Sequence, residues 1–228
     1  GRRHDFRSAP TGDPASSRRA TGGVTTTVVV CTWRGTRHLG AQLDSIAAQG
    51  VPRTVVVHDD ASGDDTAAFA GTHPGVDRVV AHPDNVGHVR NFERALADAL
   101  DGPCRYVAFA DQDDVWHPER LARGRAAMKD LERRHGTATP LLVHSDLAMI
   151  DEADRVLAPS FLRWRGYALD DAPNLARMLG QCGVMGNTCL VNRALAELAL
   201  PFPDALHVHD WWLGVLAELH GARAFLDE

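Results

Sequence analysis

Three carboxylates follow one short apolar run, and this feature constrains the fold more than any other. Residues 106–110 read Tyr-Val-Ala-Phe-Ala, and Asp111, Asp113 and Asp114 come directly after them. The apolar run predicts a buried strand, and Pro118 predicts the start of a helix. The carboxylates therefore lie past the carboxyl end of a strand, where open α/β sheets bind ligands. Oxygen-only groups suit a hard cation such as Mg²⁺ or Mn²⁺ shared with a phosphate, although an isolated Asp-x-Asp is more often a polar turn with a helix cap.

Strand-like and helix-like segments alternate along the first 135 residues. The predicted strands are 24–31, 54–57, 76–81 and 105–110, and the predicted helices are 39–50, 89–100, 118–135 and one that starts near 65. This alternation predicts an α/β fold with a single, mostly parallel central sheet flanked by helices. The second half is more irregular. It has predicted strands at 141–144 and 186–191 and predicted helices at 175–179, 193–198 and 210–219.

The composition excludes some functions. The net charge of −6 argues against nucleic acid as a partner, because binding a phosphate backbone normally needs a basic face. Lys129 is the only lysine, so mechanisms that need a catalytic lysine elsewhere are excluded. The four cysteines have no metal-ligand spacing and are predicted to be small buried hydrophobic residues in a reducing compartment: Cys31, Cys104, Cys182 and Cys189.

The chain divides into an arm and one domain. Residues 1–23 are rich in Gly, Pro, Ser, Thr and Arg without apolar periodicity, which predicts a flexible arm, and 24–228 is the predicted domain. No apolar run has the length of a membrane span, and the start of the chain lacks a signal-peptide core. We expect a cytoplasmic protein, and peripheral contact with the inner face of the membrane stays open. The sequence does not indicate an oligomeric state.

Polar side chains follow three predicted strands at 32–34, 59–60 and 111–114. Because parallel strands end at the same edge of a sheet, we expect these groups to converge. Trp33 beside Thr32 suits a planar base, a carboxylate such as Asp60 can accept hydrogen bonds from a base or ribose, and the second acidic group suits a metal-bound pyrophosphate. The pattern predicts a nucleoside diphosphate site without a Gly-rich loop. Taken singly, 59–60 also fits an Asx-turn with a helix cap, and Trp33 fits a packed core aromatic.

Five segments in order carry a family resemblance. They are Cys-Thr-Trp-Arg-Gly at 31–35, His-Asp-Asp-Ala-Ser-Gly-Asp-Asp-Thr at 58–66, Asn-Val-Gly at 85–87 with Asn91, Asp-Gln-Asp-Asp-Val-Trp at 111–116, and His-Asp-Trp-Trp at 209–212. From Val24 to its end the chain resembles the family 2 glycosyltransferases, inverting enzymes of the GT-A fold. The form of the segment at 111–116 also resembles the rhamnosyltransferase-like branch.

The resemblance implies a role for each matching position. Asp60 would contact the base, Asp113 would ligate Mn²⁺ or Mg²⁺, and Asp210 would be the general base. The rest of the nucleotide-sugar site would comprise Thr32, Trp33, Arg34, Asn85, Gly87, Asp111 and Gln112. The residues on the acceptor side would be Asp146, Asn187, Thr188, Trp211 and Trp212.

The resemblance also implies the reaction and its partners. A hexosyltransferase of polysaccharide biosynthesis would move a sugar from a nucleoside diphosphate sugar to a hydroxyl of a glycan or glycoconjugate. A deoxythymidine or uridine diphosphate donor is expected, and rhamnose is favoured through the branch alone. Two departures stand out, because Trp33 and Arg34 replace the family's Tyr and Asn. The chain also lacks the aromatic-Arg-x-His-Gly segment through which relatives commonly run on, so we expect a C-terminal truncation.

Other functional classes remain open at this stage. The first Asp of 111–115 also fits the nucleophile of haloacid dehalogenase-like phosphatases, although Lys129 is poorly placed to assist it. A nucleotidyltransferase would share the sheet and the metal, but it usually opens with a Gly-rich basic loop. A sugar-nucleotide-binding module without turnover is the alternative outside enzymology. Asp210 also fits a helix cap, and Trp211 and Trp212 fit core packing.

Overall fold

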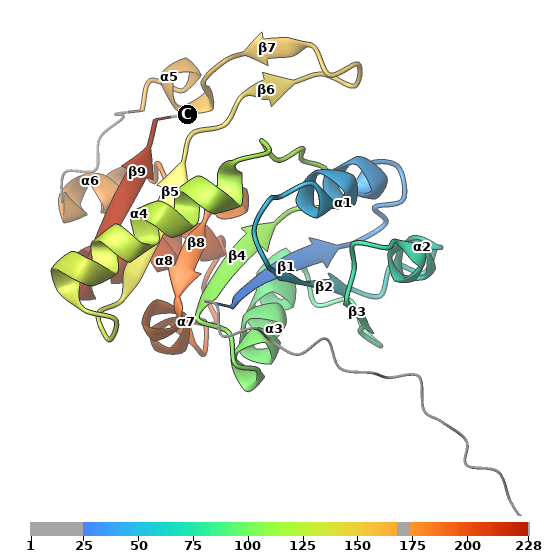
Figure 1. The fold of residues 1–228 in the computed structure, drawn as a ribbon, viewed down its shortest axis with the longest axis horizontal. Coiled ribbons are helices and arrows are strands. Elements are labelled where there is room, and N and C mark those ends of the chain that lie inside the picture. Colours follow the sequence, from blue (N-terminus) through green and yellow to red (C-terminus); the bar gives the residue numbers. More distant parts are fainter. Residues whose placement is uncertain (1–24, 168–173, 228) are drawn as a thin grey trace, which may run out of the picture.

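A seven-stranded sheet forms the centre of the computed structural model, which describes residues 25–167 and 174–227 (Figure 1). The strand order is β3-β2-β1-β4-β8-β5-β9. The strands are β1 (Thr26–Thr32), β2 (Thr54–Asp59), β3 (Arg78–Ala81), β4 (Tyr106–Ala110), β5 (Leu141–Ser145), β8 (Leu190–Asn192) and β9 (Ala222–Leu226). Strands β1 to β4 are parallel, β8 is antiparallel to β4 and β5, and β9 is parallel to β5. The predicted mostly parallel sheet is thus confirmed.

Helices cover both faces of this sheet (Figure 1). One face packs against α1 (Leu39–Ala47), α2 (Thr66–Thr72) and α4 (Arg120–His135). The other face packs against α3 (His88–Asp101), α6 (Leu175–Gly180), α7 (Arg193–Ala199) and α8 (His209–His220). A separate two-stranded ribbon of β6 (Met149–Ile150) and β7 (Val156–Ala158) precedes the short helix α5 (Phe161–Trp164).

Alternation along the central strands explains this two-layer cover. Val28 and Val30 of β1 pack into the core under α1, α2 and α4, whereas Val29 and Cys31 pack into the core under α3 and α8. Successive side chains of a strand point to opposite faces, so a strand buried on both faces must be apolar throughout. The continuous β-branched run of β1 is therefore what a central parallel strand requires.

The register of the central strands sets the position of the polar groups. Thr32 of β1 pairs with Asp59 of β2, and Val30 of β1 pairs with Ala110 of β4. The residues that follow β1, β2 and β4 consequently leave the sheet at one edge. Asp60 and Asp111, which are 51 positions apart in the sequence, therefore emerge at the same side of the fold.

One predicted strand begins four residues too early. Instead of a strand over 186–191, the chain forms the 3₁₀ turn η1 (Gly186–Thr188), and β8 begins only at Leu190. The turn is held by polar contacts that an extended chain could not make, because Gly186 donates to Asp210 and Asn187 donates to Asp114. The short elements β6, β7, α5 and β9 were not predicted, and the predicted arm at 1–23 lies outside the described residues.

All four cysteines lie in the described ranges and are free. Cys31, Cys104 and Cys189 are buried, and Cys182 is partly buried, which agrees with their prediction as small hydrophobic residues. Burial raises the pKa of the Cys182 thiol to about 12. Among the described residues, no helix combines the length and the apolar character needed to cross a bilayer.

Buried histidines make the stability of the fold sensitive to acid. His58, His144 and His209 are almost fully buried, and burial lowers the pKa of these three side chains to about 4, 3 and 3. An unfolded histidine titrates near pH 6.5, so between these pH values the unfolded chain binds more protons than the folded one. The free energy of unfolding therefore falls as the pH drops below about 6.5.

We predict that His209→Phe weakens this pH dependence. The His209 ring stacks on Phe92 with centroids 4.1 Å apart, and neither ring nitrogen has a hydrogen-bond partner among the described residues. Phenylalanine keeps the packing and cannot be protonated. Urea unfolding between pH 6.5 and 5 should show a slope shallower by up to about 1.4 kcal/mol per pH unit. The exposed His135→Gln is the matched control, and an unchanged slope in His209→Phe would contradict the account.

Candidate active site

A cavity of about 390 Å³ lies at the carboxyl edge of β1, β2 and β4. This volume falls within the usual range of small-molecule sites, about 300–1,000 Å³. Its lining includes eight residues predicted from the sequence: Thr32, Trp33, Asp60, Asn85, Gly87, Asp111, Gln112 and Asp113. Segments that are far apart along the chain thus converge on one cavity, as the predicted sheet edge requires.

The loop after β1 is tied to the loop after β4. The Trp33 backbone N–H donates to Gln112 Oε1 over 2.9 Å, and Gln112 Nε2 donates back to the Trp33 carbonyl over 3.2 Å. Gly35 leaves room for this pair, because a Cβ there would lie 2.3 Å from Gln112 Oε1 and would displace the Gln112 amide. The Trp33 side chain is 50% exposed, so it is not a core aromatic and its ring is accessible in the cavity.

Arg34 lies outside the lining of the cavity. Its backbone adopts a left-handed conformation with φ of 52°, and its N–H donates to Ser62 Oγ over 2.8 Å. The guanidinium carbon stands 4.9 Å from the centroid of the Trp33 ring. Arg34 therefore contacts Trp33, which lines the cavity, without lining the cavity itself.

Asp59 and Asp60 have separate roles. Asp59 accepts from the Thr32 hydroxyl over 3.0 Å and from the Ser62 N–H over 3.0 Å, so it makes the turn expected of an Asx motif. The Asp60 carboxylate accepts from the N–H groups of Val86 and Gly87, over 3.0 and 2.8 Å. Asp60 therefore fixes the segment that leads into α3 while it also lines the cavity.

Repulsion between carboxylates is strong within residues 111–114, which we call the acidic loop. Burial raises the pKa of the Asp111 carboxyl to about 7, and the neighbouring charges of Asp114, Asp113 and Asp210 add to the rise. Asp113 is exposed and lines the cavity, whereas Asp114 accepts a 2.6 Å hydrogen bond from Asn187. The cavity therefore concentrates negative charge at Asp111 and Asp113.

The donor set fits a hard divalent cation shared with a ligand. Asp111 and Asp113 offer only oxygen atoms, which such cations prefer. Within residues 25–167 and 174–227, no group of three or more His, Cys, Asp or Glu side chains is arranged to hold a metal ion. Mg²⁺ is usually bound through one or two carboxylates together with phosphate oxygens and water, so two carboxylates are sufficient if a diphosphate supplies further ligands.

Asp210 lies in the first turn of α8, beside the acidic loop. Its Oδ2 accepts from the Gly186 N–H over 2.9 Å, and its Oδ1 accepts from the Trp211 N–H over 2.6 Å. Burial raises the pKa of the Asp210 carboxyl above its ordinary value. Asp210 does not line the 390 Å³ cavity, but its charge contributes to the raised pKa of Asp111. The position suits a proton acceptor next to the cavity.

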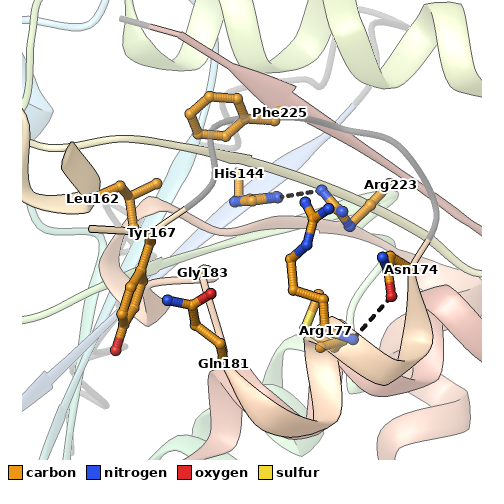
Figure 2. A pocket seen from close by; sticks show the side chains of 10 residues that line it. His144, Leu162, Tyr167, Asn174, Arg177, Gln181, Gly183, Arg223 and Phe225 are labelled. Carbon is orange, nitrogen blue, oxygen red and sulfur yellow. Dashed lines mark hydrogen bonds between the residues drawn. The ribbon is translucent and has the colours of Figure 1, made fainter. Parts of the chain in front are cut away.

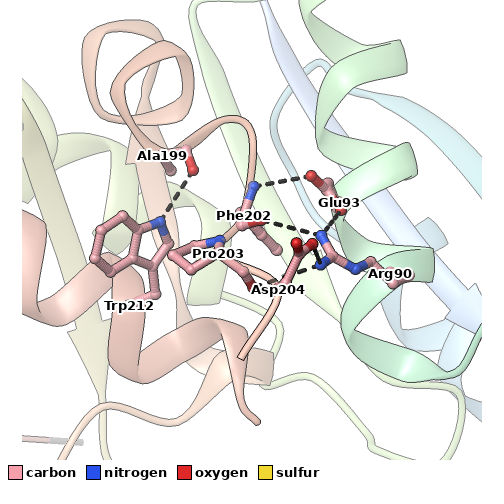
Figure 3. Close-up of polar contacts among 7 residues, drawn as sticks. All are labelled: Arg90, Glu93, Ala199, Phe202, Pro203, Asp204 and Trp212. Atoms are coloured by element: carbon pink, nitrogen blue, oxygen red, sulfur yellow. Dashed lines mark hydrogen bonds and ion pairs between the residues drawn. The ribbon is translucent and has the colours of Figure 1, made fainter. Parts of the chain in front are cut away.

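The loop that precedes α8 is anchored to α3 (Figure 3). Arg90 donates to the Phe202 carbonyl over 3.0 Å and to the Asp204 carboxylate over 2.8 Å. Glu93 pairs with Arg90 and accepts from the Phe202 N–H over 2.8 Å. These contacts fix the approach to α8 and so support the position of Asp210.

Most residues predicted for the acceptor side make structural contacts. Asp146 is buried, and its carboxylate accepts from the backbone N–H groups of Leu147 and Leu162 over 2.8 and 3.1 Å. The Thr188 hydroxyl donates within its own turn to the Met185 carbonyl. None of the five lines the cavity: Asp146, Asn187, Thr188, Trp211 and Trp212.

The two tryptophans of α8 differ. The Trp212 indole N–H donates to the Ala199 carbonyl, and the ring packs against the core, which favours a packing role (Figure 3). Trp211 is 38% exposed, and its indole N–H donates to the Met178 carbonyl over 2.6 Å. Trp211 therefore keeps an accessible ring in a fixed orientation beside Asp210.

A second, smaller cavity lies beside β5 and β9 (Figure 2). Its volume of about 30 Å³ is room for about one water molecule. Arg223 Nη1 lies 3.3 Å from His144 Nε2, and Arg223 Nε donates to Glu218 over 2.5 Å. This cavity is too small for a sugar, and its polar groups form a packed cluster.

Sequence reasoning missed part of the cavity wall. His88 and Phe92 of α3 also line it, together with Asn91, which the resemblance had already joined to the segment at 85–87. Asn91 donates to the His58 carbonyl over 3.0 Å, which fixes α3 to β2. The helical spacing of these residues could have predicted this wall. Positions i, i+3 and i+4 share one face of a helix, and α3 starts directly after Gly87.

Comparisons with known proteins agree with this geometry. Residues 27–137 match the family model described as Glycosyl transferase family 2. No curated protein sequence matches the chain. The structure of S. aureus TarS 1-349 in complex with UDP-GlcNAc is similar, with a TM-score of 0.65 and 19% identity over 90% of this chain and 56% of TarS 1-349.

A second similar structure is the mannosyltransferase PcManGT from Pyrobaculum calidifontis in complex with GDP-Man and Mn²⁺. Its TM-score is 0.61, with 21% identity over 89% of this chain and 55% of PcManGT. The chain thus spans a little over half the length of both proteins. At these identities the likeness establishes the fold. Residues 27–137 therefore match the Glycosyl transferase family 2 model, and the chain has the GT-A fold of these glycosyltransferase structures.

Proposed function

We propose that this chain transfers a sugar, with inversion, from a nucleoside diphosphate sugar to a hydroxyl of a glycan or glycoconjugate. The observation that carries the proposal is the convergence of Trp33, Asp60 and Asp113 on one cavity, with Asp210 beside it. An accessible aromatic ring, a fixed carboxylate and a crowded acidic loop are the groups that a base, a ribose and a diphosphate need. The family 2 match over residues 27–137 supports the same reaction.

The donor would bind with its base at the β1 and β2 ends of the cavity. The exposed Trp33 ring offers a stacking surface, and Asp60 and Thr32 offer oxygen atoms for hydrogen bonds. Gln112 holds the Trp33 backbone, so the part of the chain that carries the stacking ring is already fixed before a donor binds. Such order lowers the conformational cost of binding.

Asp111 and Asp113 would hold a divalent cation together with the diphosphate. When bound, Mn²⁺ or Mg²⁺ would act as a Lewis acid that stabilises the charge on the departing diphosphate. Asp113 lines the cavity and is exposed, so it is the carboxylate best placed to reach the cation. Asp111, partly buried behind it, would adopt its charged form more readily once that cation is present.

Asp210 would accept the proton of the acceptor hydroxyl. Each of its oxygens receives one backbone N–H, which fixes the carboxylate and leaves further lone pairs for the hydroxyl. Its raised pKa brings the carboxylate closer to the working range of a general base. The exposed ring of Trp211, one position on, offers a surface on which an acceptor sugar can stack.

The proposed donor is a deoxythymidine or uridine diphosphate sugar, with rhamnose favoured by the branch resemblance of 111–116. TarS 1-349 was solved with UDP-GlcNAc and PcManGT with GDP-Man, which supports a nucleotide-sugar donor without selecting the base. The domain would occupy 24–228, on the cytoplasmic side of the membrane. A haloacid dehalogenase-like reaction is less well supported, because Lys129 lies beside Arg105 and Glu132, away from the cavity that contains Asp111.

We predict that Asp113→Ala removes the dependence of nucleotide binding on metal. Without this carboxylate the charge of the diphosphate would be poorly compensated, so affinity in Mn²⁺ should fall by at least about tenfold. Calorimetry with UDP, TDP and GDP, with and without Mn²⁺, measures this. Asp130→Ala, an exposed carboxylate of α4, is the control. Unchanged affinity in Asp113→Ala would refute the assignment.

We predict that Asp210→Asn spares donor binding and removes transfer. The amide cannot accept the proton, and loss of a general base lowers turnover by roughly a hundred- to ten-thousand-fold. Release of nucleoside diphosphate from UDP- and TDP-sugars in Mn²⁺ is measured with and without acceptor, and Asp101→Asn at the end of α3 is the control. Full turnover in Asp210→Asn would place the base elsewhere, and binding without turnover in the unmodified chain would indicate a binding module.

A further inference from the structure

The turn η1 contacts both halves of the candidate site through consecutive residues. The Gly186 N–H donates to Asp210 Oδ2 over 2.9 Å. The next residue, Asn187, donates its side-chain amide to Asp114 Oδ2 over 2.6 Å. One short piece of backbone therefore holds two carboxylates: Asp210, the proposed base, and Asp114, the last carboxylate of the acidic loop.

Contacts from α4 and β4 also fix the turn η1. Arg120 of α4 donates to the Asn187 carbonyl and, over 3.4 Å, to the Phe109 carbonyl at the end of β4. Its guanidinium carbon lies 3.6 Å from the centroid of the Trp116 ring. The Phe109 N–H donates to the Cys189 carbonyl over 3.1 Å. Asn187 is thus placed between the acidic loop and a buried cation, and its side chain is already engaged.

The close packing of Gly186 leaves the turn little freedom. A Cβ at this position would lie 2.7 Å from His209 Nε2 and 3.5 Å from Asp210 Oδ2. His209 cannot move away easily, because its ring is stacked on Phe92 and tilted against Phe109. A shift of Asn187 must therefore carry Gly186 with it, and the N–H that orients Asp210 would shift too.

We propose that Asn187 is a positioning residue that holds Asp210 in register with the acidic loop through its hydrogen bond to Asp114. Asn187 itself does not contact the substrate. The role rests on the proposed function of Asp210, and it accounts for a polar residue that lies near the site and lines none of its cavity. Substitution should therefore lower turnover while donor binding is kept.

The test exchanges the amide of Asn187 and the carboxylate of Asp114. Asn187→Asp places two carboxylates against each other, and Asp114→Asn leaves two amides. The double variant Asn187→Asp with Asp114→Asn restores one amide and one carboxylate in the same place. Two measurements are made on the full chain: hydrogen–deuterium exchange of the peptide that contains η1, and kcat and KM for diphosphate release from UDP- and TDP-sugars in Mn²⁺. Asn174→Ala, which removes the cap of α6, is the matched control.

Asn187→Asp should raise exchange in η1 and lower kcat by about tenfold or more, with UDP or TDP affinity in Mn²⁺ kept within about threefold. The double variant should recover both exchange protection and kcat to within about threefold, a result that only a direct pair gives. Unchanged exchange in Asn187→Asp, or no recovery in the double variant, overturns the proposal. If the unmodified chain lacks turnover, the exchange measurements alone decide on the coupling, and the proposed function fails separately.

Discussion

The pairing of β1 with β2 on one side and β4 on the other is the interaction on which the rest of the molecule depends. These three strands are parallel and in register, so the residues that follow them leave the sheet at one edge. Backbone hydrogen bonds fix that register, and apolar side chains on both faces prevent a slip, because a shift of one residue would turn buried valines toward the wrong layer. The convergence of Thr32, Asp60 and Asp111 follows from the sheet alone.

The edge of the sheet concentrates negative charge, and this determines its chemistry. Asp111 has a pKa near neutrality because it is removed from water and surrounded by three other carboxylates. In the proposed function, a cavity with this electrostatic character would attract a cation and, through it, a diphosphate. Burial, together with the charge of Asp113, also raises the pKa of Asp114, and the hydrogen bond from the Asn187 amide partly offsets this rise. The polar contacts around η1 therefore belong to the same electrostatic arrangement as the cavity.

Sequence patterns predicted the part of the structure that depends on periodicity. The apolar runs that became β1, β2 and β4 and the carboxylates after them were placed correctly, since strand ends and turn residues follow local chemistry. The strand predicted over 186–191 begins only at Leu190, because the residues before it are held in η1 by contacts to Asp114 and Asp210, both remote in the sequence. Likewise, the cavity-lining role of His88 depends on how α3 meets the sheet, which one sequence does not reveal.

The most direct test of the account is a crystal structure of the chain with Mn²⁺ and UDP or TDP. The account predicts an anomalous difference peak next to Asp113, with the diphosphate on the same ion and the base in the cavity between Trp33 and Asp60. A nucleotide bound in a different cavity, or Mn²⁺ held away from the acidic loop, would contradict it.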